Sequence, residues 1–403
     1  MGGCGKHMLH PYDNFDLTFD DLANLICKVG NADIEAIEKV DGVNLHWTIG
    51  IDGYPRFALN MTQMKSGGLS PVEFMKRMQN HPGSPQFVSG MQEINNRARI
   101  LHNRREGPAM FWPFSRNLTK WVNTEVVSAE NPQCFKYDKD SLVYHDLVEY
   151  DPVTKSPVSV LEDFSSPWQN FIKTEMSQPW RWNTHHRLPV TYSRNSRNIE
   201  RTLSRLHSIM GFWKLRPETT LRDYYAEITK KELSQWLKRV EAQAVVENVW
   251  YGVSNNIRFI KKELPEWAPM DRFNRIALSK HRQGYWGECK GELASLFADF
   301  GSTVIYGVKS NLIEDSEAQT QRIKRQIDFN VEQAKIHAET NPEILEELEA
   351  NLDKFERLGN KIPMMEGIVF TMDGNKYKLT GSFPFMNRIC GAVRYSLGIQ
   401  LPG

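Results

Sequence analysis

The stretch Glu38-Lys39-Val40-Asp41-Gly42-Val43-Asn44 opens the part of this chain whose pattern says most about the fold. From Val43 to Ile49, apolar residues occupy alternate positions, and Asp52-Gly53 then leads into a second apolar run. Alternation of this kind predicts a half-buried β-strand, and Asp-Gly is a typical hairpin turn. We therefore expect β-structure over residues 37–59.

A second stretch of this character lies near residue 370. Glu366-Gly367-Ile368-Val369-Phe370 runs through Asp373-Gly374 into Lys376-Tyr377-Lys378, which predicts another hairpin. Lys376 and Lys378 are two residues apart, so their side chains share one face of the strand. A two-residue loop pairs 372 with 375 and leaves Glu366 with the opposite parity. We predict a bulge or twist at Gly367 if the three charged side chains line one site.

The middle of the chain changes from strand patterns to helical patterns. Residues 220–250, 317–336 and 343–358 read as helices, and Asn341-Pro342 and Gly359 supply start and stop signals for the last of them. Thr18 followed by Asp21 predicts a short capped helix that ends near Gly30. We predict an α+β domain in two parts, residues 1–160 and 356–403, separated by a mainly helical insertion or accessory domain over 161–355.

The order of the motifs resembles that of a known superfamily. Lys-x-Asp-Gly at Lys39, Glu-Gly followed by two apolar residues at Glu366, and Lys-x-Lys at Lys376 resemble the covalent nucleotidyltransferases, which include ATP-dependent DNA ligases, RNA ligases and mRNA capping enzymes. Glu38 and Asn44 are more similar to the RNA ligase branch. The resemblance covers about residues 1–150 and 360–385, and it implies an ATP-grasp-like nucleotidyltransferase domain of antiparallel sheets with helices.

The resemblance also implies roles for individual residues. Lys39 would be the nucleophile that carries AMP, which requires a fraction of neutral amine, and Lys376 and Lys378 could lower its pKa and hold phosphates. Glu366 and Glu125 would support the Mg²⁺ (or Mn²⁺) ion of bound ATP. The residues implied to bind the nucleotide are Glu38, Asp41, Gly42, Asn44, Lys65 and Glu125, with Tyr144 or His145 as the aromatic partner of adenine.

Charge is balanced along this chain, with 50 Lys and Arg against 49 Asp and Glu. A nucleic-acid partner must therefore be met by a local patch. Residues 180–216 offer one, because clustered cations suit phosphates and the interleaved aromatic residues suit unpaired bases. The alternative is a solvated helix face packed on its own aromatics. The candidate nucleic-acid contacts are Arg181, Arg187, Arg194, Arg197, Arg201 and Arg205.

The five cysteines are widely spaced and include no Cys-x-x-Cys pair. This disfavours a disulfide framework or a zinc site and favours a reducing cytoplasm. No apolar run approaches the roughly 18 residues that a membrane helix needs. We expect a cytoplasmic protein without a membrane partner, and the combination of motifs and insertion suggests a viral or phage protein in the host cytoplasm.

Together these features predict an ATP-dependent RNA ligase. It would join 5′-phosphate to 3′-hydroxyl ends through a lysyl-AMP intermediate, as in RNA repair. RNA is preferred over DNA because of Asn44 and because no barrel domain follows Gly381. Three alternatives remain: a DNA ligase, an adenylyltransferase with another acceptor, and a non-catalytic nucleotide-binding scaffold whose helical arm binds a protein partner.

Overall fold

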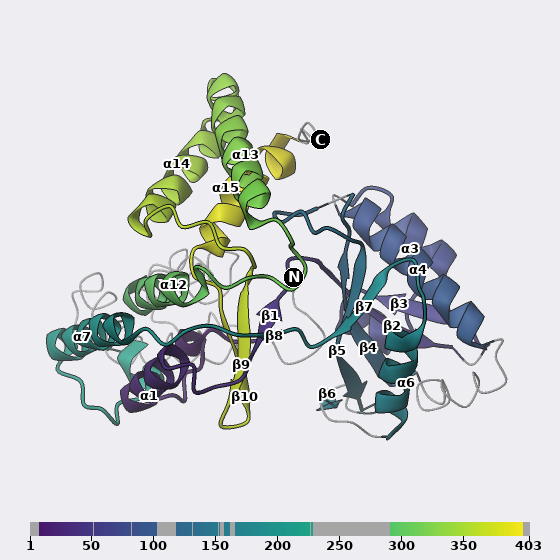
Figure 1. Ribbon diagram of the computed structural model, residues 1–403, viewed down its shortest axis with the longest axis horizontal. Helices are drawn as coiled ribbons and strands as arrows, with labels where there is room; N and C mark the ends of the chain where they lie inside the picture. Colours follow the sequence, from purple (N-terminus) through teal and green to yellow (C-terminus); the bar gives the residue numbers. More distant parts are fainter. Residues whose placement is uncertain are drawn as a thin grey trace, which may run out of the picture.

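The computed structural model describes residues 8–102, 118–151, 153, 157–161, 166–228 and 291–397, apart from positions 51, 82, 131 and 226. These residues form an α+β protein with two sheets and helices packed around them (Figure 1). At this level of architecture the predicted fold class is confirmed.

The larger sheet has the strand order β3-β2-β4-β5-β6, and β7 pairs with β5 in parallel. The other pairings in this sheet are antiparallel. The predicted hairpin forms, because β2 and β3 pair directly through the Asp52-Gly53 turn region. The strands are β2 (Val43–Ile49), β3 (Pro55–Ala58), β4 (Lys120–Val127), β5 (Ser141–Tyr150), β6 (Pro157–Leu161) and β7 (Asn183–His186).

The smaller sheet has the strand order β10-β9-β1-β8 and is antiparallel throughout. The hairpin predicted around Asp373-Gly374 forms in this sheet. The φ angles of Asp373 and Gly374 are 49° and 74°, and a type I′ turn requires positive φ at both positions. Central β1 brings the two ends of the sequence together. The strands are β1 (Ala36–Lys39), β8 (Pro189–Val190), β9 (Gly367–Met372) and β10 (Asn375–Leu379).

One face of the larger sheet is covered by α3 (Pro71–Met78), α4 (Ser84–His102) and α6 (Ser166–Ser177) (Figure 1). Its alternating apolar residues pack under these helices, and each large buried side chain contributes roughly 1.5–3 kcal/mol. Residues at the intervening positions face the opposite way, and several of them are polar. The buried face includes Leu45, Trp47, Val122, Val126 and Tyr144, and Phe171 of α6 packs in the same core.

A second group of helices packs on the smaller sheet: α1 (Phe19–Gly30), α7 (Ser196–Trp213) and α12 (Gly291–Ile305). The capped helix predicted at Thr18 is confirmed, because Thr18 and Asp21 each accept a hydrogen bond from the other's backbone N–H. The cap sets where α1 begins, and its apolar face then joins the core beneath β9 and β10.

The last three long helices form a separate group at the top of Figure 1: α13 (Ser316–Ile336), α14 (Pro342–Arg357) and α15 (Phe383–Leu397). As predicted, α14 begins at Pro342 after Asn341, and Gly359 follows it with a φ of 79°. Ala334, Ile344 and Leu348 form part of the core between α13 and α14.

The segment 161–355 is mainly helical where it is described, but it also contributes to both sheets. Its residues 183–186 form β7 beside β5, and residues 189–190 form β8 beside β1. The predicted boundaries therefore do not isolate a helical body, because both sheets include strands from this segment. Most of the predicted helix over 220–250 lies outside the described residues, and its described positions 221–225 are helical.

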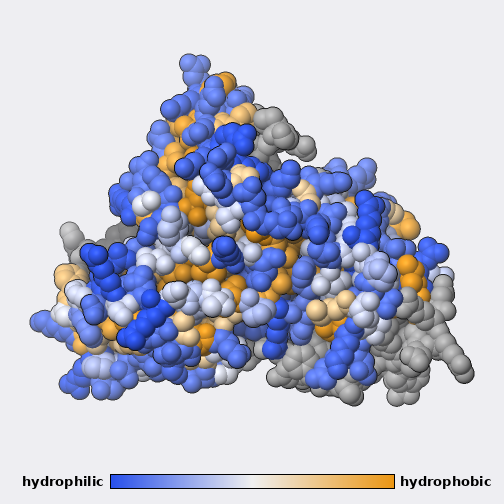
Figure 2. All heavy atoms as spheres, viewed as in Figure 1, coloured by the Kyte–Doolittle hydropathy of each residue, from blue (hydrophilic) through white to orange (hydrophobic). Residues whose placement is uncertain are grey.

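In the view of Figure 2, hydrophobic side chains gather toward the middle of the molecule, and hydrophilic side chains cover much of the outer helices. Among the helices that the structure describes, none has the length and apolar character needed to cross a membrane.

Candidate active site

Lys39 lies at the end of β1, where the smaller sheet meets the turn into the larger one. Its Nζ atom is 2.6 Å from Oε2 of Glu366. The pair forms because Lys39 lies opposite Gly367 in the β1–β9 ladder, so the residue just before β9 comes to the lysine. The structure therefore brings together the two motifs, which are more than 300 positions apart.

Glu366 reaches this position by a bend, and β9 is regular from Gly367 to Met372. The strand contains no bulge at Gly367, and the irregularity is instead a bend at Glu366, which lies just outside the strand. Gly367 has a different role. A Cβ atom here would overlap the carbonyl oxygen of Leu379, so only glycine allows β9 and β10 to approach this closely.

Lys378 lies on the same side of the smaller sheet as Lys39. Burial, and then the positive charge of Lys39, lower the pKa of Lys378. Burial also acts to lower the pKa of Lys39, but the carboxylates of Glu366 and Glu125 outweigh it and leave the pKa of Lys39 raised. In this state Lys39 is a charged ion-pair partner, and a protonated amine of this kind is not nucleophilic.

Glu125 projects from β4 of the larger sheet toward the same region. Burial acts to raise its pKa, but hydrogen bonding from His145 and the charge of Lys39 prevail and lower it. Nε2 of His145 lies 3.1 Å from Oε2 of Glu125. The site is therefore built from both sheets, with Lys39 and Glu366 on one and Glu125 and His145 on the other.

A bulge in β5 decides which of the two candidate aromatics faces this site. Asn123 pairs with Asp146 and Thr124 with Tyr144, so His145 is the additional residue. A bulge of this kind places consecutive side chains on one face, here His145 and Asp146.

Tyr144 faces away from the candidate site. It is 1% exposed, packs near Trp47 and Phe171, and donates a hydrogen bond of 3.0 Å to Glu175. Of the two residues predicted to contact adenine, the structure brings only His145 to the site.

Lys376 connects the two sheets through a chain of polar side chains. Its Nζ is 3.7 Å from Oδ2 of Asp146, whose Oδ1 accepts a hydrogen bond of 2.8 Å from Asn123. Asn123 in turn accepts a hydrogen bond of 2.6 Å from the amide of Asn44. Because a carboxylate only accepts, Asp146 orients both amides and leaves Oδ1 of Asn44 buried without a hydrogen-bond partner in the described part of the chain.

Asp41 and Gly42 shape the turn that follows Lys39. Burial, and then the charge of Glu366, raise the pKa of Asp41 to about 7. An added Cβ at Gly42 would meet the carbonyl oxygen of Val126 at 2.6 Å, so glycine is needed for close approach to β4. Both residues act on the backbone of the turn in this structure.

Glu38 and Lys65 occupy positions that differ from their predicted contacts with the nucleotide. The Glu38 carboxylate is buried and accepts hydrogen bonds from Ser310 and from the backbone and side chain of Asn311. Lys65 ends α2 (Met61–Lys65) and is exposed, and its side chain makes no hydrogen bond or ion pair with the described residues. The structure therefore does not bring either side chain into contact with Lys39, Glu366 or Glu125.

The six predicted nucleic-acid arginines do not form a single patch. Arg181 lies just before β7 at the larger sheet, whereas four others lie on or beside α7 at the smaller sheet. Arg201 and Arg205 are both paired with Asp299, at 3.1 and 2.9 Å. Arg187 lies between β7 and β8 in a left-handed conformation, Arg194 is hydrogen-bonded to Ser196, and Arg197 is exposed.

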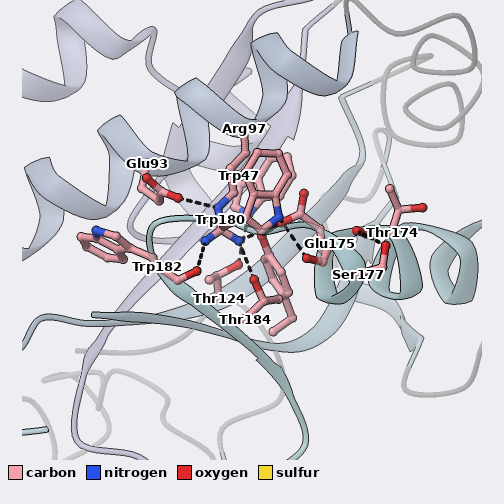
Figure 3. A network of polar contacts seen from close by, with 11 residues as sticks. Trp47, Glu93, Arg97, Thr124, Thr174, Glu175, Ser177, Trp180, Trp182 and Thr184 are labelled. Atoms are coloured by element: carbon pink, nitrogen blue, oxygen red, sulfur yellow. Dashed lines mark hydrogen bonds and ion pairs between the residues drawn. The ribbon is translucent and has the colours of Figure 1, made fainter. Parts of the chain in front are cut away.

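Trp180 and Trp182, from the basic segment 180–216, pack against the larger sheet and its helices. Trp182 is buried, and the Trp180 ring lies 5.0 Å from the guanidinium of Arg97 (Figure 3). Arg97 itself is 2% exposed and pairs with Glu93 and Glu175 at 2.7 and 2.9 Å. This network favours the alternative of aromatics packed against the fold, and no local pattern in the sequence indicates it.

Other residues near the site were also missed. Asn123 and Asp146 adjoin predicted residues, and strand alternation from Glu125 would have indicated Asn123. His46 is fully buried two residues after Asn44, and burial, followed by the charge of His145, lowers its pKa to about 4. The same alternation along β2 could have identified it.

The charges of the site fit a magnesium nucleotide. Glu366 and Glu125 both lie close enough to act on Lys39, and Mg²⁺ is commonly held by one or two carboxylates together with phosphates and water. Within the described ranges, no group of three or more His, Cys, Asp or Glu side chains is arranged to hold a metal. Glu366 and Glu125 would thus share the ion with the phosphates.

A scan against protein-family models, a search of curated proteins and a search of solved structures each found no match. The resemblance to nucleotidyltransferases therefore rests on the short motifs and on the side chains that the structure gathers around Lys39.

Proposed function

We propose that this protein is an ATP-dependent nucleotidyltransferase that forms lysyl-AMP on Lys39, and that it acts as an RNA ligase on a nucleotidyltransferase-like fold. The observation that carries the proposal is the Lys39–Glu366 pair at 2.6 Å, with Lys378 and Glu125 beside it. A half-buried lysine among charged groups of both signs is suited to a reaction in which its own charge must change.

In the proposed first step, Nζ of Lys39 attacks the α-phosphorus of ATP. A nitrogen–phosphorus bond forms, the bond to the bridging oxygen breaks, and pyrophosphate leaves with the electron pair. Lys39 must first lose its proton to solvent water, and the pairing with Glu366 opposes this loss. Glu366 and Glu125 would hold a Mg²⁺ ion together with the phosphates, and its positive charge would offset the negative charge of these groups.

Lys378 supports the same step by its position. It faces Lys39 and Glu366, so its charge favours the neutral form of Lys39 and can hold a phosphate oxygen. Lys376, which lies 3.7 Å from Asp146 in the structure, would be the second cation near the phosphates.

In the proposed later steps, AMP passes to a 5′-phosphate end and a 3′-hydroxyl then displaces it. The motif Glu38-Lys39 with Asn44 favours an RNA end over a DNA end. The candidate nucleic-acid contacts are Arg181, Arg194 and Arg197, which have no acidic partner among the described residues, together with Arg187 between β7 and β8. These arginines do not form one continuous patch.

The experiment is incubation with α-labelled ATP and Mg²⁺, followed by denaturing electrophoresis and intact mass. We expect a covalent adduct of about 329 Da, the mass of an AMP group joined to lysine. Lys39→Ala should abolish it, and Lys335→Ala, which changes an exposed lysine on α13, should not. Nicked and single-stranded RNA and DNA are then offered as acceptors.

The outcomes separate the alternatives. Joining of DNA but not RNA identifies a DNA ligase, and an adduct without joining of either identifies another acceptor. The absence of an adduct with ATP, GTP and NAD⁺ would refute the nucleotidyltransferase and leave a nucleotide-binding scaffold.

A further inference from the structure

Residues 133–137, here called the clamp loop, hold the backbone of the turn after Lys39. The backbone N–H of Asp41 donates a hydrogen bond of 2.7 Å to the hydroxyl of Tyr137. In the other direction, Oδ2 of Asp41 accepts hydrogen bonds from the backbone N–H groups of Cys134 and Phe135, at 2.8 and 3.2 Å. Both the main chain and the side chain of Asp41 are therefore held by this loop.

The next residue of the turn is held as well. The side-chain amide of Gln133 donates a hydrogen bond of 2.8 Å to the carbonyl oxygen of Gly42. Asp41 is 5% exposed and Tyr137 is 1% exposed, so water does not compete for the contacts of Asp41 with the clamp loop. Buried hydrogen bonds to backbone groups are costly to break, and the turn consequently has little freedom while the clamp loop stays in place.

The clamp loop is attached to the C-terminal helices on its other side. Arg322 of α13 donates a hydrogen bond of 2.9 Å to the carbonyl oxygen of Cys134. Phe135 stacks on Phe383 of α15, with ring centroids 5.4 Å apart and planes 20° from parallel. The same apolar core includes Val40, next to Lys39. A continuous set of contacts thus runs from α13 and α15 through the loop to the turn.

We propose that the clamp loop positions Lys39 for its attack on ATP, and that α13 fixes the clamp loop through Arg322. The inference rests on the proposed function and gives the C-terminal helices a part in it. Attack requires Nζ to lie about 3–3.5 Å from phosphorus and in line with the leaving group. A small movement of the turn therefore slows the reaction even when ATP remains bound.

The test compares two buried tyrosines that each lose one hydrogen bond to the backbone. Tyr137→Phe removes the partner of Asp41, and Tyr225→Phe removes a hydrogen bond of 2.8 Å to the carbonyl of Tyr12 in the core of the smaller sheet. The rate of adduct formation is measured in single turnovers over a range of ATP concentrations. Tyr137→Phe should lower the maximal rate about 10- to 100-fold, with little change in the ATP concentration that gives half of it. Tyr225→Phe should keep the wild-type rate.

The anchor on α13 is tested with Arg322→Ala and Arg322→Lys. Lysine can still donate to the Cys134 carbonyl, so it should restore most of the rate that alanine loses. If the wild type forms the adduct and Tyr137→Phe reacts at the same rate as Tyr225→Phe, the positioning role of the clamp loop is refuted and the proposed function stands. If Arg322→Ala reacts as fast as the wild type, the role of Arg322 in fixing the clamp loop is refuted. Failure of the wild type to form any adduct refutes the proposed function, and this inference with it.

Discussion

Asp41 shows how one buried carboxyl group can connect the chemistry of the site with the stability of the fold. It lies between the clamp loop and Glu366, and its carboxylate accepts two backbone hydrogen bonds. These bonds act to lower its pKa, but burial and the charge of Glu366 outweigh them. The residue therefore holds a proton in the folded protein at a pH where it would be ionised in the unfolded chain.

This difference predicts a pH dependence of stability. The pKa of Asp41 is raised from 3.8 to about 7, so the folded state binds its proton more tightly than the unfolded state. The contribution of Asp41 to the free energy of unfolding is then largest below about pH 4 and is lost as the pH rises to about 7. The side chain of Asp41→Asn cannot titrate. The free energy of unfolding of this variant, relative to that of the wild type, should therefore increase as the pH rises from about 4 to about 7. Denaturant titrations across this range check it, and a constant difference would contradict it.

At the scale of elements, the hairpin of β9 and β10 places Glu366, Lys376 and Lys378 around the end of β1. Residue pairing within the hairpin is set by its Asp373-Gly374 turn, and its approach to residues 379–380 is set by Gly367. These local features explain why a short sequence motif gives a defined arrangement of charges.

Gly367→Ala should separate β9 from β10, because the new methyl group meets backbone atoms that cannot rotate away. Forced overpacking of this kind costs about 1–3 kcal/mol. We expect a loss of that size in the free energy of unfolding, measured by denaturant titration, and slower adduct formation on Lys39. Gly211→Ala in α7 is the matched control, since nothing lies within 4 Å of its added Cβ. It should be neutral or stabilising by up to about 1 kcal/mol, and equal losses in the two variants would refute the argument.

At the scale of the whole molecule, the groups that stabilise the larger sheet are separate from those that line the site. The Arg97 network joins α4, α6 and β7 on the helix-covered face, where Tyr144 also lies. Glu125, His145 and Asp146 occupy the opposite face. Stability and chemistry can consequently be changed independently in this part of the protein.

Arg97→Met should destabilise the protein strongly, because it leaves Glu175 buried without its cation. Breaking a buried ion pair in this way costs about 3–5 kcal/mol. Arg357→Met, which removes an exposed ion pair with Asp353 in α14, should cost less than about 1 kcal/mol. Thermal or denaturant unfolding measures both, and folded Arg97→Met should still form the adduct at the wild-type rate. A large loss of rate in the folded variant would show that the two faces are coupled.

The sequence by itself determined the features that depend on neighbouring residues. Strand alternation and the Asp-Gly turns predicted the two hairpins, and Thr18 with Asp21 and Asn341 with Pro342 predicted where α1 and α14 begin. These signals are readable because hydrogen bonds and side-chain directions within a few residues depend on the local sequence. The resemblance to the nucleotidyltransferases also implied that Lys39 and Glu366 belong to one site, but it did not predict the ion pair between them.

Only the tertiary structure decided the remaining features. The bulge in β5 turns His145, and not Tyr144, toward the site. Asp299 forms ion pairs with Arg201 and Arg205, and residues 310–311 donate hydrogen bonds to the Glu38 carboxylate. Each of these contacts joins different strands, helices or loops, and most of the partners lie far apart in the sequence. Their geometry follows from how the two sheets and the helices pack, and no local pattern in the chain encodes it.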